Sequence, residues 1–126
     1  MFTHVVVGTN NLQNSKTFYD AVFAALGADA GMVMGDGVSY RHNGLSFMVT
    51  KPINGEPATH ANGGTIGFAM ASPEQTDAWH AAGIANGGTT CEDPPGTRAF
   101  GDLKFYLAYL RDPDGNKLCG MFPMSQ

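Results

Sequence analysis

The segment Arg111–Asn116, which reads RDPDGN, decides the fold of this chain. It lies between two runs that are typical of β-strands, residues 105–110 and 117–122. Pro113 pre-sets φ for a turn, and Gly115 tolerates positive φ, so the chain can reverse its direction here. We therefore predict a β-hairpin near the C-terminus, with the two aspartates of the turn bonded to the local backbone.

Length and composition favour one globular domain. The chain has 126 residues, which is enough for a sizeable core. Hydrophobic residues make up 43% and charged residues only 14%, as expected of a folded rather than a disordered chain. The net charge is −4 and no run of Lys and Arg forms a basic stripe, so we expect no nucleic-acid partner.

The sequence also predicts no membrane association. No apolar stretch approaches the length of a membrane span. Residues 1–4 lack the charged start and the long apolar segment of a signal peptide. We therefore expect a cytoplasmic protein. In that reducing compartment Cys91 and Cys119 are expected to be free thiols, and their spacing matches no zinc motif.

The first half of the chain predicts one strand, one helix and three further strands. Valines supply β-propensity to the first strand, and a helical period of apolar residues follows it. Asn10-Asn11 stops the strand and can cap the helix. Asp36-Gly37 and Asn43-Gly44 are two-residue hairpin signals. The predicted elements are a strand at 2–9, a helix at 15–26, and strands at 31–34, 37–42 and 45–50.

The second half of the chain starts the same order again. Ser72–Gln75 reads as a capping box with proline at the first helical position. Arg98 follows Pro94-Pro95-Gly96 and is expected on a loop that could cover a cavity. The predicted elements are a strand at 65–71, a helix ending at 85, and strands at 89–91, 103–110 and 117–122.

The two halves therefore repeat a βαβββ order at a spacing of about 61 residues. We expect a single domain over residues 1–126, with a first module at about 1–52, a linker at about 53–62 and a second module at about 63–126. Four motif pieces follow one another along the chain: His4–Val7, then Asn11-Leu12 followed by Ser15 and Phe18-Tyr19, then Gly64–Phe68, then the RDPDGN segment.

In this order and spacing the chain resembles the vicinal oxygen chelate superfamily, which includes glyoxalase I, bleomycin resistance proteins and extradiol dioxygenases. The resemblance implies an α+β, glyoxalase-like fold. In that fold two βαβββ modules form a curved, cup-shaped mixed sheet with helices on the convex face.

Strand alternation, together with the sheet order that the resemblance implies, predicts which residues face the cup. His4, Met48, Thr65 and Cys119 are expected to converge in one cavity, and Met121 faces the same way. In metal-dependent members the four converging positions typically hold two histidines and two glutamates, which bind a divalent ion.

Of that ligand set only His4 is retained here. Thr65 is a neutral hydroxyl, Met48 is a soft thioether, and Cys119 could bind zinc as a thiolate. Two good ligands are fewer than a zinc site normally has. We therefore expect no cofactor, with His4 hydrogen-bonded at the cup wall and Cys119 as a small buried hydrophobe. A divalent metal held by His4 and Cys119 is the alternative.

For two further pocket candidates, the sequence does not decide on which face of the sheet the side chain lies. Arg41 would be an anion anchor if it lay inside the cup, and a surface charge otherwise. Tyr106 and Tyr109 point in opposite directions, so one of them could place its hydroxyl near a ligand; the alternative is ordinary core packing. We include Arg41 and Tyr106 among the ligand-pocket residues.

Three functions follow from the resemblance. The preferred one is a protein that binds a small molecule in its cup without the usual metal centre, like bleomycin resistance proteins, whose cationic ligand suits a net acidic chain. A divergent metal-dependent lyase or dioxygenase, with His42 recruited beside His4, is the second. A dimeric interaction module without a small-molecule site is the third. The resemblance also implies a homodimer.

Overall fold

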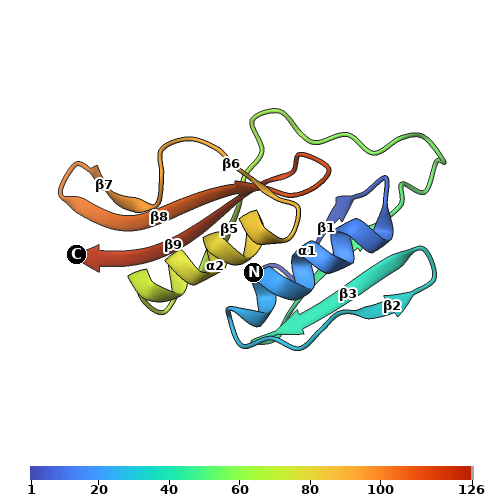
Figure 1. The fold of residues 1–126 in the computed structure, drawn as a ribbon, viewed down its shortest axis with the longest axis horizontal. Helices are drawn as coiled ribbons and strands as arrows, with labels where there is room; N and C mark the ends of the chain where they lie inside the picture. Colours follow the sequence, from blue (N-terminus) through green and yellow to red (C-terminus); the bar gives the residue numbers. More distant parts are fainter. Residues whose placement is uncertain (126) are drawn as a thin grey trace.

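The structure consists of two modules, each with one helix packed on one sheet (Figure 1). The computed structural model describes residues 1–125. The first module contains β1 (His4–Gly8), α1 (Leu12–Ala24), β2 (Met32–Met34), β3 (Gly37–His42) and β4 (Leu45–Thr50). The second contains β5 (Ile66–Ala69), α2 (Pro73–Ala85), β6 (Thr89–Thr90), β7 (Gly96–Phe100), β8 (Leu103–Arg111) and β9 (Lys117–Ser125).

The strand order is the same in both modules and confirms the predicted α+β class. The first sheet has the order β1-β4-β3-β2, and the second has the order β5-β9-β8-β6, with β7 also paired to β8. In each sheet the first strand runs parallel to the last, and the other pairs are antiparallel. No helix in the described part of the chain is both long and apolar enough to span a membrane.

Capping residues set the start of both helices. The side chain of Asn11 accepts a hydrogen bond from the backbone N–H of Asn14 at 3.0 Å, so α1 begins three residues earlier than predicted. Ser72 accepts from the backbone N–H of Gln75 at 3.0 Å and starts α2 as expected. Helix α1 packs Tyr19 and Phe23 against Phe47 of β4, and α2 packs Trp79 against Gly120 of β9.

Residues 96–100 form strand β7, where we had expected a loop, so that prediction was wrong. The Pro-Pro-Gly signal ends before the strand, and Gly101, with φ of 62°, turns β7 directly back onto β8. Arg98 is fixed within this turn region. Its guanidinium donates to the carbonyl oxygens of Gly96 and Asp93, both at 2.9 Å.

The two modules keep separate sheets, whereas we had expected a single curved sheet. Strands β1 and β5 are the inner edges of the two sheets, and no Cα atom of one lies within 8 Å of a Cα atom of the other. Hydrogen-bonded neighbours in a sheet lie only about 5 Å apart. A gap therefore remains between the two edges.

The modules are joined by their helices and by a shared aromatic core. Helices α1 and α2 lie against each other in the middle of the molecule, in front of the sheets (Figure 1). Phe68 of the second module has its ring centroid 5.4 Å from that of Phe23 and 5.7 Å from that of Phe47, both in the first module. It also lies 6.3 Å from the ring of Trp79. The core is thus continuous across both modules.

The RDPDGN hairpin forms a second joint between the modules. Asp112 is buried, and its Oδ1 accepts the local backbone N–H groups of Asp114 and Asn116, as expected of a turn aspartate. Its Oδ2, however, accepts a 2.6 Å hydrogen bond from the hydroxyl of Tyr19 in α1. Asp114 likewise accepts from Ser15 at 3.1 Å. The expectation of purely local bonding was therefore wrong for both aspartates.

Candidate functional site

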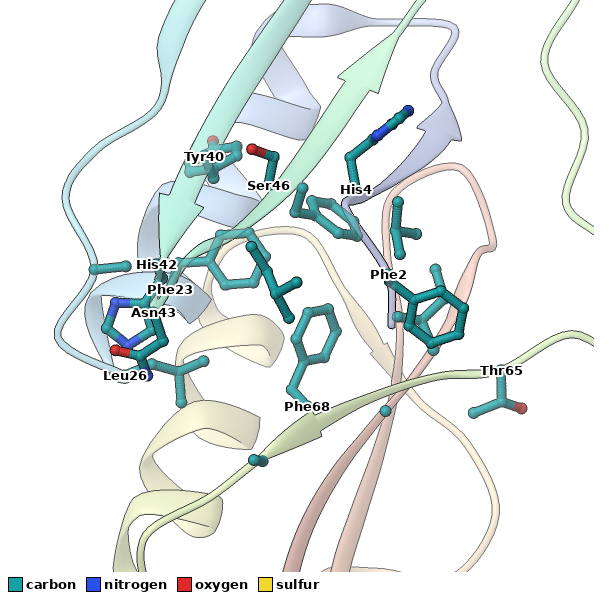
Figure 2. A pocket seen from close by; sticks show the side chains of 17 residues that line it. Phe2, His4, Phe23, Leu26, Tyr40, His42, Asn43, Ser46, Thr65 and Phe68 are labelled. Atoms are coloured by element: carbon teal, nitrogen blue, oxygen red, sulfur yellow. The ribbon is translucent and has the colours of Figure 1, made fainter.

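A cavity of about 450 Å³ opens in the gap between the two sheets. The rings of Phe23, Phe47 and Phe68, which come from α1, β4 and β5, line it and form what we call its floor. Figure 2 shows Phe23 and Phe68 of this set. The three ring centroids lie 5.3 to 5.7 Å apart, each pair close to an edge-to-face arrangement. We call this space the inter-module cavity.

The separation of the sheets explains why aromatic side chains line a cavity. Phe47 and Phe68 belong to the layer between sheet and helix, where strand alternation directs every second side chain. In a continuous sheet a neighbouring strand would cover this layer. Because β1 and β5 remain unpaired on their inner edges, the layer is open between them, and Val5 and Ile66 form part of the lining.

Polar groups lie around the cavity rather than on its floor. His4 and Ser46 lie together on one side, and His42 and Asn43 lie on another, at the turn after β3 (Figure 2). The imidazole Nδ1 of His4 is hydrogen-bonded to the hydroxyl of Thr3 at 2.8 Å, which leaves its Nε2 available to a ligand. The polar contacts that a ligand could make are therefore few and placed at the rim.

The hydroxyl of Tyr40, which also lines the cavity, is committed to the protein. It donates to Oδ1 of Asp20 in α1 at 2.7 Å. Burial, followed by the contact with the Asp20 carboxylate, raises the pKa of Tyr40 far above its usual value, so the phenol stays neutral. Among the described residues, no Asp, Glu, Lys or Arg lines the cavity. The interior therefore offers no counter-charge to a buried ion.

The structure brings only two of the four predicted converging residues to the cavity. His4 and Thr65 line its rim. Met48 follows Phe47 on β4 but points to the opposite face of the sheet, beside Val6 of β1. Cys119 lies one strand further out in the second sheet, beside Gly67 of β5. Met48 and Cys119 thus belong to separate sheets on either side of the gap.

The strand register assigns the faces of Arg41 and Tyr106. Arg41 is the direct partner of Ser46, and residues paired in this way share a face, so its side chain lies opposite α1, on the side of His4. Tyr106 lies on the other face of its sheet, where its hydroxyl donates to Oδ1 of Asp77 in α2 at 2.7 Å. This bond is the main reason why the pKa of Tyr106 is raised.

Tyr109, and not Tyr106, shares a face with Cys119, its direct partner in β9. Burial raises the pKa of the Cys119 thiol, which is 4% exposed, and it raises the pKa of Tyr109 to about 12. Lys117 pairs with Glu92 and places its ammonium 5.0 Å from the centre of the Tyr109 ring. Met121 follows on the same face and is 38% exposed.

The residues at the four metal positions do not fit the divalent ion that the resemblance implies. Cys119 is a buried thiol rather than the carboxylate that a hard divalent ion prefers, and Thr65 is a neutral hydroxyl. Met48 is a soft ligand that a hard, oxygen-activating ion does not favour. Within residues 1–125, no group of three or more His, Cys, Asp or Glu side chains is placed to hold a metal ion.

Sequence reasoning missed the cavity floor. Strand alternation directs Phe47 and Phe68 toward the helices, where side chains ordinarily belong to the core. No local pattern reports that two edge strands remain apart. The available signal was that a phenylalanine lies on β4, next to the edge strand β1, and another lies on the edge strand β5.

The family model described as Glyoxalase/Bleomycin resistance protein/Dioxygenase superfamily matches residues 1–119. The search of curated proteins gave no match.

Solved structures resemble the chain over nearly its whole length. A glyoxalase/bleomycin resistance protein from Albidiferax ferrireducens T118 is 59% identical, with 95% of this chain and 97% of that chain covered and a TM-score of 0.92. A glyoxalase/bleomycin resistance protein/dioxygenase family enzyme from Burkholderia phytofirmans PsJN is 17% identical, with 94% and 95% covered and a TM-score of 0.71. A lactoylglutathione lyase from Agrobacterium tumefaciens is 19% identical, with 96% and 92% covered and a TM-score of 0.67.

Proposed function

Because this chain belongs to the glyoxalase/bleomycin resistance protein/dioxygenase superfamily, we propose that it binds a small molecule in the inter-module cavity without a family-type metal centre. The observation that carries this proposal is the combination of an aromatic floor with a few hydrogen-bonding groups at the rim. Small-molecule pockets typically have this composition and enclose about 300 to 1,000 Å³. In this proposal His4 and Thr65 contact the ligand at the rim.

The residues beyond the rim extend the proposed site. Met48, Cys119 and Met121 lie on the faces opposite the helices, beside the strands that border the cavity. Thioethers are flexible and polarizable, so these walls can adapt to ligands of different shape. Arg41 would interact with a negatively charged part of a ligand.

We also propose that the protein works as a homodimer. Several apolar side chains are exposed on the strands, and three of them are consecutive: Met32, Val33 and Met34 in edge strand β2 are 67%, 57% and 57% exposed. An exposed apolar edge strand readily pairs with another chain. Sedimentation velocity over a range of concentrations tests this proposal. A species of monomer mass at all concentrations would contradict it.

The proposed function is tested by a broad ligand screen that follows the melting temperature. Each hit is then titrated against Gly67→Leu. Gly67 lines the cavity, and a Cβ atom added there meets no atom within 4 Å, so a leucine at this position is expected to narrow the mouth. Ala99→Leu, an exposed change on β7, is the matched control.

The proposal predicts hits whose affinity falls at least about tenfold in Gly67→Leu and is unchanged in Ala99→Leu, because the leucine takes the space of the ligand. Hits that bind both variants equally would contradict the cavity as the site. A screen without hits, together with a stable dimer, would favour the interaction module instead.

A further inference from the structure

Three polar residues form a straight row across the first sheet at the mouth of the inter-module cavity. His4 of β1 is the register partner of Ser46 in β4, and Ser46 is the partner of Arg41 in β3. Direct partners on neighbouring strands share a face and have Cβ atoms about 5 Å apart. All three side chains therefore project from the face opposite α1. We call these residues the donor row.

The donor row begins at the cavity. His4 and Ser46 line it and lie together on one side (Figure 2). Arg41 lies one strand further out and is exposed. Because an arginine side chain is long and flexible, its guanidinium can reach back over Ser46 toward the cavity mouth.

The guanidinium of Arg41 is available to a ligand. Within residues 1–125, the ion pairs are Lys16 with Asp20 and Lys117 with Glu92, and neither involves Arg41. Arginine presents a planar fork of N–H donors that matches a carboxylate, the imidazole Nε2 of His4 can donate, and Ser46 adds a hydroxyl. The row thus combines three donors with one fixed positive charge.

The cavity and the row together select for a ligand with two different ends. The floor of Phe23, Phe47 and Phe68 favours a ring that can contact aromatic edges and faces. No carboxylate lines the cavity, so a cationic end would find no counter-charge there. An anionic end would meet the donor row at the mouth. This local arrangement is opposite in sign to the net charge of −4.

From this arrangement we infer that the ligand of the inter-module cavity is an aromatic carboxylate or a similar anion, with its ring on the phenylalanine floor and its charge on His4, Ser46 and Arg41. This inference rests on the proposed function and adds the chemical class of the ligand. It assigns Arg41 as the residue that selects the charge.

Three probes with one ring system and different charges test the inference: 2-naphthoate, 2-naphthol and 2-naphthylmethylammonium, each titrated calorimetrically at neutral pH. We expect 2-naphthoate to bind at least about tenfold more tightly than the ammonium probe, because only the carboxylate finds a partner at the mouth. Neutral 2-naphthol is expected to bind with intermediate affinity.

Arg41→Gln then separates the charge from the ring. The variant is expected to bind 2-naphthoate about three- to tenfold more weakly, because one charge-assisted contact is lost. Its affinity for 2-naphthol is expected to stay the same. Lys104→Gln is the matched control, because it removes one exposed positive charge from β8, away from the cavity. It is expected to leave the affinity of all three probes unchanged.

Two results would overturn the inference. Equal affinity for the three probes, or equal effects of Arg41→Gln and Lys104→Gln, would show that the donor row does not select the charge. If 2-naphthol still binds in that case and Gly67→Leu blocks it, the cavity remains the site and only the ligand class is wrong. If no probe binds, the inference fails, and the broad ligand screen decides separately whether the cavity binds anything.

Discussion

The hydroxyl of Tyr19 donates a 2.6 Å hydrogen bond to Oδ2 of Asp112, and this bond joins helix α1 of the first module to the hairpin of the second. Both side chains are almost completely buried. The same Asp112 oxygen also accepts from the side-chain amide of Asn116, which in turn donates to the carbonyl oxygen of Gly8 in β1. The hairpin thus holds the modules at one end of the gap.

Replacement of Tyr19 by phenylalanine is expected to lower the free energy of unfolding by about 1.5 to 3 kcal/mol, the range for a hydrogen bond to a charged group. Tyr40→Phe is the control, because its hydroxyl bond to Asp20 stays within the first module. Urea unfolding measures both. Hydrogen exchange should be faster at the boundary between the modules only in Tyr19→Phe. Equal exchange in both variants would contradict the claim that the Tyr19–Asp112 bond holds the modules together.

Gly115→Ala is expected to destabilise the hairpin more than Gly55→Ala. Both glycines have positive φ, 91° and 75°, and such a conformation costs a residue with a Cβ about 1 to 2 kcal/mol. Only at Gly115 would the Cβ also lie 2.8 Å from Nδ1 of His60, whereas at Gly55 it meets open space. Denaturant midpoints of the two variants compare the costs. Equal values would show that His60 moves aside freely.

The architecture could be predicted from the sequence because its signals are local. Asn11 and Ser72 mark the helix starts, and Asn43-Gly44 marks the turn between β3 and β4, whereas the turn before β3 lies at Gly35-Asp36, one residue earlier than predicted. Strand β7 was not predicted because the Pro-Pro-Gly segment before it is typical of a loop. The distant bonds of Asp112 and the gap between β1 and β5 depend on how the two modules meet, and no local pattern encodes that relation. The aromatic floor of the site was missed for the same reason.

Alkaline pH is expected to destabilise the protein through Cys119. Burial raises the pKa of this thiol in the folded state, so above the usual thiol pKa of about 8.5 the unfolded chain loses a proton that the folded chain keeps. The stability from this group is complete below that pH and is lost as pH rises through the folded-state pKa.

Cys119→Ala should therefore show a shallower loss of unfolding free energy between about pH 8 and pH 10 than the unaltered protein. Cys91→Ala, which removes the other free thiol, is the control. Urea unfolding across this pH range gives the slopes. A Cys119→Ala slope equal to that of the unaltered protein would show that the thiol ionises equally easily in both states.

Removal of metal ions is expected to leave the protein unchanged, because the residues at the four metal positions do not form a divalent-ion ligand set. Dialysis against a chelator should not shift the melting temperature, and elemental analysis after exposure to Ni²⁺, Zn²⁺, Mn²⁺ or Fe²⁺ should give no stoichiometric metal. A stoichiometric ion that is lost in His4→Ala would instead support the metal-dependent lyase or dioxygenase.

The central claim is that the ligand lies in the gap between the sheets, on the aromatic floor. The most direct test measures nuclear Overhauser effects between a bound ligand ring and labelled methyl groups. The account predicts contacts to Ile66 and Leu45, which line the inter-module cavity. Contacts to the methyl groups of Met48 and Met121 without contacts to Ile66 and Leu45 would place the ligand on the sheet faces opposite the helices. That result would contradict binding on the aromatic floor.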